Sequence, residues 1–343
     1  MAPVSFRPKV IVKRLLQALP ERSRVVVEAR FGLGKTPDRL TLETIGNNYG
    51  ITRERVRQIE NHALATLRKS PVFKDAESAF RELERIIESL GGIVCEDDLL
   101  NFVTKDKSMQ NHIYFLLVLG DPFTYKKEDD EAKRCWYVDP TLALKVQTAL
   151  QKLYSNLTDD DLIPEAEMIE RFLDEMKDLN DRYKNDEIAR RWLGISKKVS
   201  RNPLGEWGIS SSSNVKTKGI RDYAYLAVKR HGSPLHFKEV AALIEKLFKR
   251  AAHVATCHNE LIKDPRFVLV GRGIYALREW GYASGVVRDV IRDILKKEGP
   301  LTRNDVVSRV LKERHVKENT ILVNLQNQKY FKKGKDGRYA LAK

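Results

Sequence analysis

The chain has 343 residues, enough for two to five small domains, and 42% of them are hydrophobic, which is sufficient for packed cores. Lysine and arginine outnumber aspartate and glutamate by 62 to 47, so the formal net charge is +15 and an anionic partner, above all nucleic acid, is expected. No apolar run approaches the roughly 18 residues of a membrane span and no signal peptide is evident, which excludes a membrane protein and predicts a cytoplasmic one.

Residues 41–69 are predicted to form two short helices joined by a tight turn. Thr41 is expected to cap the first helix, and Gly50 to end it in the left-handed conformation that suits glycine. Thr52 is expected to cap the second helix. A buried stripe on that helix is predicted from apolar residues at steps of three and four: Val56, Ile59, Ala63 and Leu67.

The opposite face of the second helix is polar and mostly cationic, and its side chains can bond base edges in the major groove. Together with the turn, this is typical of a helix-turn-helix with a recognition helix. The alternative is an ordinary solvated helix whose arginines do nothing specific. The predicted DNA-binding residues of this module are Thr41, Thr52, Arg53, Glu54, Arg55, Arg57, Gln58 and Asn61.

The phrase RFGLGKT…LTLETIGNNYGITRERVRQIENHALATLRK, within residues 8–72, closely resembles the region 4 helix-turn-helix of bacterial primary sigma factors, and its most specific part is TRERVRQIE. The resemblance implies that Arg53, Glu54, Arg57 and Gln58 contact bases or backbone of the minus-35 promoter element. It also implies docking on the flap of the RNA polymerase β subunit. Sigma factors use a further region to melt the promoter. Because the chain begins almost at region 4, we expect that it does not initiate transcription alone.

Four later segments repeat one pattern: a helix, a short apolar step, two more helices and a closing aromatic-x-aliphatic strand. The opening residues are 70, 72 and 66 positions apart: Ile93, Ile163, Leu235 and Leu301. The closing aromatics are 71, 68 and 64 positions apart: Trp136, Trp207, Tyr275 and Tyr339. Two landmarks with nearly the same period predict an internal repeat.

Each repeat is predicted to be a winged helix, in which the small strand pins the wing onto the helices. The fold class is therefore mainly α with small β wings: an N-terminal helix-turn-helix followed by a tandem array of winged-helix domains. The predicted boundaries are 1–75 for the helix-turn-helix, 76–140, 141–214 (acidic), 215–282 and 283–343 for the winged helices.

The last two wings have glycine-rich turns with cations at the tip, which are hairpin signals. We expect Arg272, Lys335 and Arg338 to contact DNA phosphates. The alternative is an exposed turn kept soluble by charge. The third repeat, residues 217–282, is similar to the HARE-HTH winged-helix domain through the run HNELIKDPRFVLVGRGIYAL. That family includes the N-terminal domain of the RNA polymerase delta subunit, and the resemblance implies a role with nucleic acid.

The charge is uneven along the chain. Residues 1–75 hold 15 basic and 7 acidic side chains, residues 76–214 hold 19 and 27, residues 215–282 hold 13 and 6, and residues 283–343 hold 15 and 7. Both ends are therefore expected to bind DNA, and the middle is not. A local basic patch could defeat that expectation, and its candidate members are Arg190, Arg191, Lys197, Lys198 and Arg201.

We expect neither a metal nor a cofactor nor a small-molecule substrate. The cysteines, Cys95, Cys135 and Cys257, are interpreted as buried or incidental thiols. The histidines of the third repeat, His236, His253 and His258, are expected to cap helices or lie in the core. The segment GLGKT, from Gly32 to Thr36, resembles the end of a phosphate-binding loop. Such a loop needs a glycine five residues before Gly34, where this chain has Ala29, so no nucleotide site is expected.

The leading hypothesis is a sigma-related, DNA-binding transcription factor that binds promoter DNA and acts with RNA polymerase. The first alternative is a delta-like accessory subunit that binds mainly the polymerase. The remaining alternative is a component of a DNA-modifying enzyme, although no catalytic residues emerge.

Overall fold

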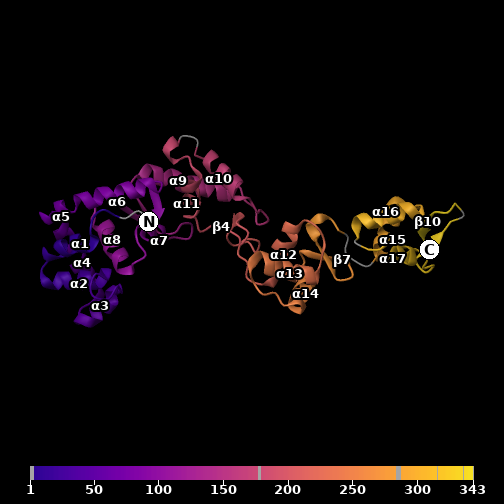
Figure 1. The fold of residues 1–343 in the computed structure, drawn as a ribbon, viewed down its shortest axis with the longest axis horizontal. Coiled ribbons are helices and arrows are strands. Elements are labelled where there is room, and N and C mark those ends of the chain that lie inside the picture. The colour runs from indigo at the N-terminus through magenta and orange to yellow at the C-terminus, as the bar shows by residue number, and fades with distance from the viewer. Residues whose placement is uncertain (1–3, 177–178, 283–286, 315, 335, 343) are drawn as a thin grey trace. The chain divides into compact units, whose positions relative to one another are not determined.

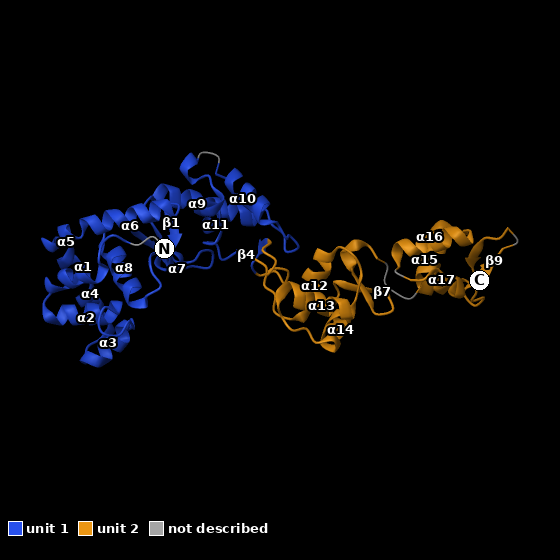
Figure 2. Ribbon diagram, viewed as in Figure 1, with its two compact units in different colours: residues 1–200, 207–210 blue, residues 201–206, 211–343 orange. Residues whose placement is uncertain are grey.

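The structure, a computed structural model, describes residues 4–176, 179–282, 287–314, 316–334 and 336–342. It is mainly helical with small antiparallel sheets, as predicted. Two compact units are present: residues 1–200 with 207–210 form the first, and residues 201–206 with 211–343 form the second (Figure 2).

The first unit begins with the predicted helix-turn-helix and its supporting helices. These are α1 (Pro8–Gln17), α2 (Glu21–Phe31), α3 (Leu42–Tyr49), α4 (Arg53–Lys69) and α5 (Val72–Asp75). Thr41 caps α3 by accepting the Thr44 N–H at 3.1 Å, and Thr52 caps α4 by accepting the Arg55 N–H at 3.2 Å. Gly50 ends α3 in the left-handed region, with φ of 63°. Both caps and the turn glycine are confirmed.

A second glycine allows α3 to approach the turn closely. A Cβ atom on Gly46 would lie 2.6 Å from the carbonyl oxygen of Ile51, which is closer than van der Waals contact allows. Gly46 is helical and buried, so glycine is required here because there is no room for a side chain, and not because of the backbone conformation. The turn between α3 and α4 therefore depends on two glycines for two different reasons.

Four winged helices follow, each in the predicted order of elements. The first two consist of α6 (Glu77–Ser89), β1 (Ile93–Cys95), α7 (Glu96–Val103), α8 (Lys107–Leu119), β2 (Thr124–Lys126) and β3 (Cys135–Tyr137), then α9 (Pro140–Ser155), α10 (Glu165–Asp174), α11 (Asp186–Leu193), β4 (Val199–Arg201) and β5 (Trp207–Ile209). A 3-10 turn at Asp181–Tyr183 precedes α11.

The last two winged helices lie in the second unit. They consist of α12 (Ile220–His231), β6 (Leu235–His236), α13 (Phe237–Phe248), α14 (Val254–Lys263), β7 (Phe267–Gly271) and β8 (Ile274–Leu277), then α15 (Val287–Glu298), α16 (Arg303–Glu313), α17 (Glu318–Leu325), β9 (Phe331–Lys333) and β10 (Tyr339–Leu341) (Figure 1).

The opening apolar residue of every repeat pairs with its closing strand. The pairs are Ile93–Tyr137, Ile163–Trp207, Leu235–Tyr275 and Leu301–Tyr339. In the first and third repeats this pair belongs to a strand that forms a three-stranded sheet with the wing. In the second and fourth repeats the pair is an isolated bridge beside a two-stranded sheet. The two landmarks of the predicted repeat therefore pair directly in the last three repeats, and in the first repeat Ile93 pairs with Tyr137, the neighbour of Trp136.

Helix α4 contributes to two hydrophobic cores. Val56 and Ile59, in its first half, pack with Val26 and Ile45 inside the helix-turn-helix. The buried residues of its second half, Ala63 and Leu67, join a larger core to which α1, α6 and α8 also contribute. The predicted stripe is therefore confirmed as buried, but its two ends serve different cores. The five predicted domain boundaries stay predictions.

Candidate nucleic-acid interface

The polar face of α4 is exposed along its whole predicted length. Arg53, Glu54, Arg55, Arg57, Gln58 and Asn61 are all exposed and lie on this one helix. Because the opposite stripe is buried in two cores, the helix cannot rotate about its axis without unpacking. The face is therefore fixed in its orientation relative to the helix-turn-helix.

Glu54 and Arg57 form a two-point ion pair on this face. Arg57 donates from Nη2 to Oε1 of Glu54 at 2.7 Å and from Nε to Oε2 at 2.9 Å. The hydrogen bond from Arg57 lowers the pKa of Glu54 below its usual range, and the same bond raises that of Arg57. A guanidinium has five N–H donors, so three remain for a base or a phosphate.

A second polar pair lies beside the first. Arg55 donates from Nη1 to Oε1 of Gln58 at 3.1 Å. Amides and guanidinium groups are the side chains that bond adenine and guanine in two-point fashion. Arg53 and Asn61 extend the same face at its two ends. The arrangement can contact several successive base pairs.

Two arginines tie α4 to its surroundings. Arg30 of α2 pairs with Glu60 at 3.4 Å and donates to the Leu40 carbonyl at 3.1 Å. Near the C-terminal end of α4, Arg68 donates from Nε to the carbonyl of Leu119, the last residue of α8, at 3.0 Å. The helix is thus held at its middle by α2 and near its C-terminal end by the first winged helix.

Asn111, on α8 of the first winged helix, holds the loop between α2 and α3. It is fully buried, and its Nδ2 donates to the carbonyls of Gly32 and Pro37 at 3.0 and 2.8 Å. Its Oδ1 accepts from Nε of Arg39 at 2.7 Å, while the Arg39 guanidinium lies 3.9 Å from the ring centre of Tyr114. Sequence reasoning missed this contact, because an isolated asparagine 79 positions from its partner carries no local signal.

The described wing residues, Arg272 and Arg338, lie in the second unit, Arg272 in the third repeat and Arg338 in the fourth. Arg272 is exposed in the turn between β7 and β8. Arg338 is exposed beside β10 and lies 4.0 Å from Asp336. Lys335 lies outside the described residues. Arg272 and Arg338 are single exposed side chains at or beside turns, and α4 with its six exposed side chains is the larger preformed surface.

The basic candidates of the second winged helix are mostly neutralised by acids. The ion pairs are Arg190–Glu165 at 2.8 Å, Arg191–Glu187 at 2.5 Å and Lys197–Glu128 at 2.9 Å. These three carboxylates lower the net positive charge around the basic candidates, which is the quantity that favours phosphate binding.

The histidines of the third repeat have structural roles. His236 caps α13 by accepting the Lys238 N–H at 3.3 Å, and His258 stacks on Phe237 with ring centres 4.2 Å apart. His253 precedes α14 at its N-cap position without a side-chain cap. In the part of the chain that the structure describes, no three histidines, cysteines or carboxylates cluster as metal ligands would.

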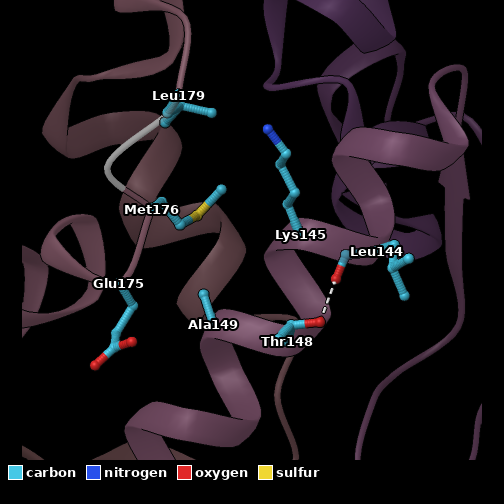
Figure 3. Close-up of a pocket in the computed structure, with 7 residues that line it drawn as sticks. All are labelled: Leu144, Lys145, Thr148, Ala149, Glu175, Met176 and Leu179. Atoms are coloured by element: carbon cyan, nitrogen blue, oxygen red, sulfur yellow. Dashed lines mark hydrogen bonds between the residues drawn. The ribbon is translucent and has the colours of Figure 1, made fainter.

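A shallow groove of about 280 Å³ lies beside α9 in the second winged helix (Figure 3). Its lining residues are Leu144, Lys145, Thr148, Ala149, Glu175, Met176 and Leu179. The Thr148 hydroxyl donates to the Leu144 carbonyl at 2.9 Å, so it is occupied by the backbone of its own helix. These residues do not combine a nucleophile with a base, and the groove offers no chemistry that competes with the α4 surface.

None of the helices among the described residues is both long and apolar enough to cross a membrane.

Comparison with known proteins finds a family similar to the segment that contains α4. Residues 15–69 match the family model for sigma-70, region 4, which confirms that resemblance. The chain is 45% identical over 60 residues to RNA polymerase sigma factor RpoD of Helicobacter pylori (strain ATCC 700392 / 26695), covering 18% of the chain and 9% of the relative. It is 39% identical over 74 residues to RpoD of Neisseria gonorrhoeae, covering 22% and 11%. It is 51% identical over 57 residues to sigma factor RpoS of Coxiella burnetii, covering 17% and 16%.

The chain thus spans between 9% and 16% of the length of these relatives. The match to the family model covers the end of α1 and the whole of α2, α3 and α4, including the exposed face of α4. The similarity of residues 217–282 to the HARE-HTH domain stays a prediction.

Proposed function

We propose that this protein is a DNA-binding transcription factor that binds minus-35-like promoter DNA through α4 and acts with bacterial RNA polymerase in initiation or its regulation. The observation that carries the proposal is the exposed, pre-oriented polar face of α4 within residues that match sigma-70 region 4. No catalytic role is part of the proposal.

In the proposed complex α4 enters the major groove, and its N-terminal residues contact base edges. Arg53 and Arg57 are one turn apart, so both enter the same groove. The helix before a recognition helix crosses the DNA backbone in this class of protein. Tyr49, which ends α3 and is 51% exposed, presents a hydroxyl that can donate to a phosphate. Sequence reasoning had not singled out Tyr49.

The wings are proposed as auxiliary phosphate contacts. Residues 215–343 carry 28 basic and 13 acidic side chains, and Arg272 and Arg338 lie at or beside the wing turns. Lys335 stays a predicted phosphate contact on its sequence alone. Counterion release on DNA binding would then make affinity fall steeply with salt. The acidic middle, residues 76–214, is proposed as a spacer or a protein-contact surface.

The test is a fluorescence-anisotropy titration of the full chain against a duplex that carries a minus-35-type element and against a shuffled duplex of equal length. We expect tighter binding to the first duplex at every salt concentration, and a linear fall of log affinity with log salt for both. Equal affinity for the two duplexes would refute sequence-specific recognition.

A second candidate function is that of a polymerase accessory subunit that binds mainly the enzyme. The observation that favours it is the acidic composition of residues 76–214, which suits a protein partner better than DNA. Co-purification with core RNA polymerase after nuclease treatment separates the two candidates. Retention of the chain without DNA supports the accessory role, and loss of the chain with the DNA supports the first proposal.

A further inference from the structure

Two of the three cysteines lie opposite each other on neighbouring strands of the first winged helix. Strands β1 and β3 pair in antiparallel fashion, and Cys95 is the register partner of Cys135. The two residues are 40 positions apart in the chain, so their spacing gave no sign of a pair. Cys257 is buried in the third repeat, which belongs to the other compact unit.

The hydrogen bonds of the sheet show which kind of cross-strand pair this is. The Glu96 N–H donates to the Arg134 carbonyl at 3.1 Å, so Glu96 and Arg134, the pair next to Cys95 and Cys135, are a hydrogen-bonded pair. Because the two kinds of pair alternate along antiparallel strands, Cys95 and Cys135 form a non-hydrogen-bonded pair. The Cα atoms of such a pair are about 4.5 Å apart, inside the range of about 4.4–6.8 Å that a disulfide spans.

The two side chains lie on the same face of the sheet, and each thiol donates to a backbone carbonyl. The Cys135 thiol donates to the Lys133 carbonyl at 3.0 Å. The interaction between the two groups lowers the pKa of Cys95 below its usual value and raises that of Cys135. Cys95 is 5% exposed and Cys135 is fully buried, so a small oxidant reaches Cys95 first and Cys135 is the resolving thiol.

We propose that Cys95 and Cys135 are a redox-active dithiol, a modification site that hydrogen peroxide converts into a cross-strand disulfide. The oxidant is a small peroxide because Cys95 is too buried to admit a bulky disulfide reagent. This inference is independent of the proposed DNA-binding function.

The reaction has two steps. The Cys95 sulfur attacks one peroxide oxygen, the O–O bond breaks, and a sulfenic acid forms while one water leaves. The Cys135 sulfur then attacks the Cys95 sulfur, the S–O bond breaks, and the departing oxygen takes the Cys135 proton and leaves as a second water. Two thiols and one peroxide thus give one disulfide and two waters, and a dithiol reductant reverses the change.

The pair lies at a seam within the first unit. The Cys95 thiol donates to the Gly194 carbonyl, directly after α11, at 3.8 Å. The backbone of Lys133, close before Cys135, donates to the Ile195 carbonyl at 2.9 Å. Oxidation removes the proton that Cys95 gives to Gly194 and ties β1 to β3 covalently. We therefore expect a change of amide exchange around Gly194 and a higher urea midpoint for the oxidised chain.

The test uses the full chain with hydrogen peroxide, followed by catalase, denaturation and alkylation with N-ethylmaleimide. The expected product has lost two hydrogens, carries one maleimide on Cys257, and yields a peptide that links Cys95 to Cys135. Cys257 is the matched internal control, because it is buried and its pKa is raised to about 11 by burial. Prior reduction with dithiothreitol should restore three alkylated cysteines.

The variant Cys135→Ser isolates the first step. It should form no disulfide, and dimedone added together with the denaturant should trap a sulfenic acid on Cys95 alone. Three alkylated cysteines in the peroxide-treated wild-type chain would overturn the proposal. A disulfide that involves Cys257 or joins two chains would also overturn it. The wild-type measurement decides the question even where the variant does not fold.

Discussion

The contact between Asn111 and the loop before α3 gives a quantitative prediction. Replacing Asn111 by Ala removes two neutral hydrogen bonds, to the Gly32 and Pro37 carbonyls, and one bond from the Arg39 guanidinium. Neutral bonds contribute about 1 kcal/mol each and a bond to a charged group about 2 kcal/mol. Asn111→Ala should therefore lower the free energy of unfolding of the first unit by about 4 kcal/mol.

Urea unfolding monitored by tryptophan fluorescence can measure this loss. The buried tryptophans of the first unit, Trp136, Trp192 and Trp207, dominate the signal. With a slope of about 2–3 kcal/mol per molar urea, the midpoint should fall by about 1–2 M. The matched control is Asn156→Ala at the exposed end of α9, which should change stability by less than about 0.5 kcal/mol. Equal midpoints for the two variants would refute the holding role of Asn111.

Three further predictions concern the turn, the repeats and the division of charge. Gly46→Ala should abolish specific DNA binding and lower the thermal midpoint, although alanine favours helices by about 1 kcal/mol. The control Gly34→Ala should do neither, because a Cβ atom there would meet nothing within 4 Å. A stable Gly46→Ala chain that still binds DNA would contradict the turn geometry. A fragment of residues 217–282 should unfold cooperatively on heating, as followed by circular dichroism. A fragment of residues 217–250 should not, because it lacks α14 and the wing. Cooperative unfolding of the shorter fragment would contradict the predicted repeat boundary. In anisotropy titrations at one salt concentration, residues 76–214 should bind duplex DNA more weakly than the pieces before and after them, and binding as tight as that of either neighbour would rule out a spacer role.

Local signals predicted much of the fold. Thr41, Gly50 and Thr52 fixed the ends of α3 and α4 because caps and left-handed glycines act within a few residues of the chain. The repeats were predictable because two landmarks recur along the chain with nearly the same period. The exposed face of α4 followed from the helical period of its buried stripe.

Contacts between distant segments could not be predicted. The hydrogen bonds of Asn111 and the pairing of Cys95 with Cys135 join segments 79 and 40 positions apart, and neither has a local pattern. The contribution of α4 to two cores could not be predicted either, because the periodicity of a buried stripe does not show which other helices pack against each part of it. These contacts depend on how the helix-turn-helix and the first two repeats pack within one unit.

The most direct test of the central claim compares Arg57→Ala with Arg81→Ala on specific and random duplexes. Arg81 is a matched control, since it pairs with Glu77 at 2.6 Å on the exposed face of α6, as Arg57 pairs with Glu54 at 2.7 Å on α4. Arg57→Ala should cost about 1–3 kcal/mol on the specific duplex and less on the random one, because a two-point base contact is lost. Arg81→Ala should leave the ratio of the two affinities unchanged. Equal losses of Arg57→Ala on both duplexes would contradict base recognition by α4 and reduce Arg57 to a phosphate contact.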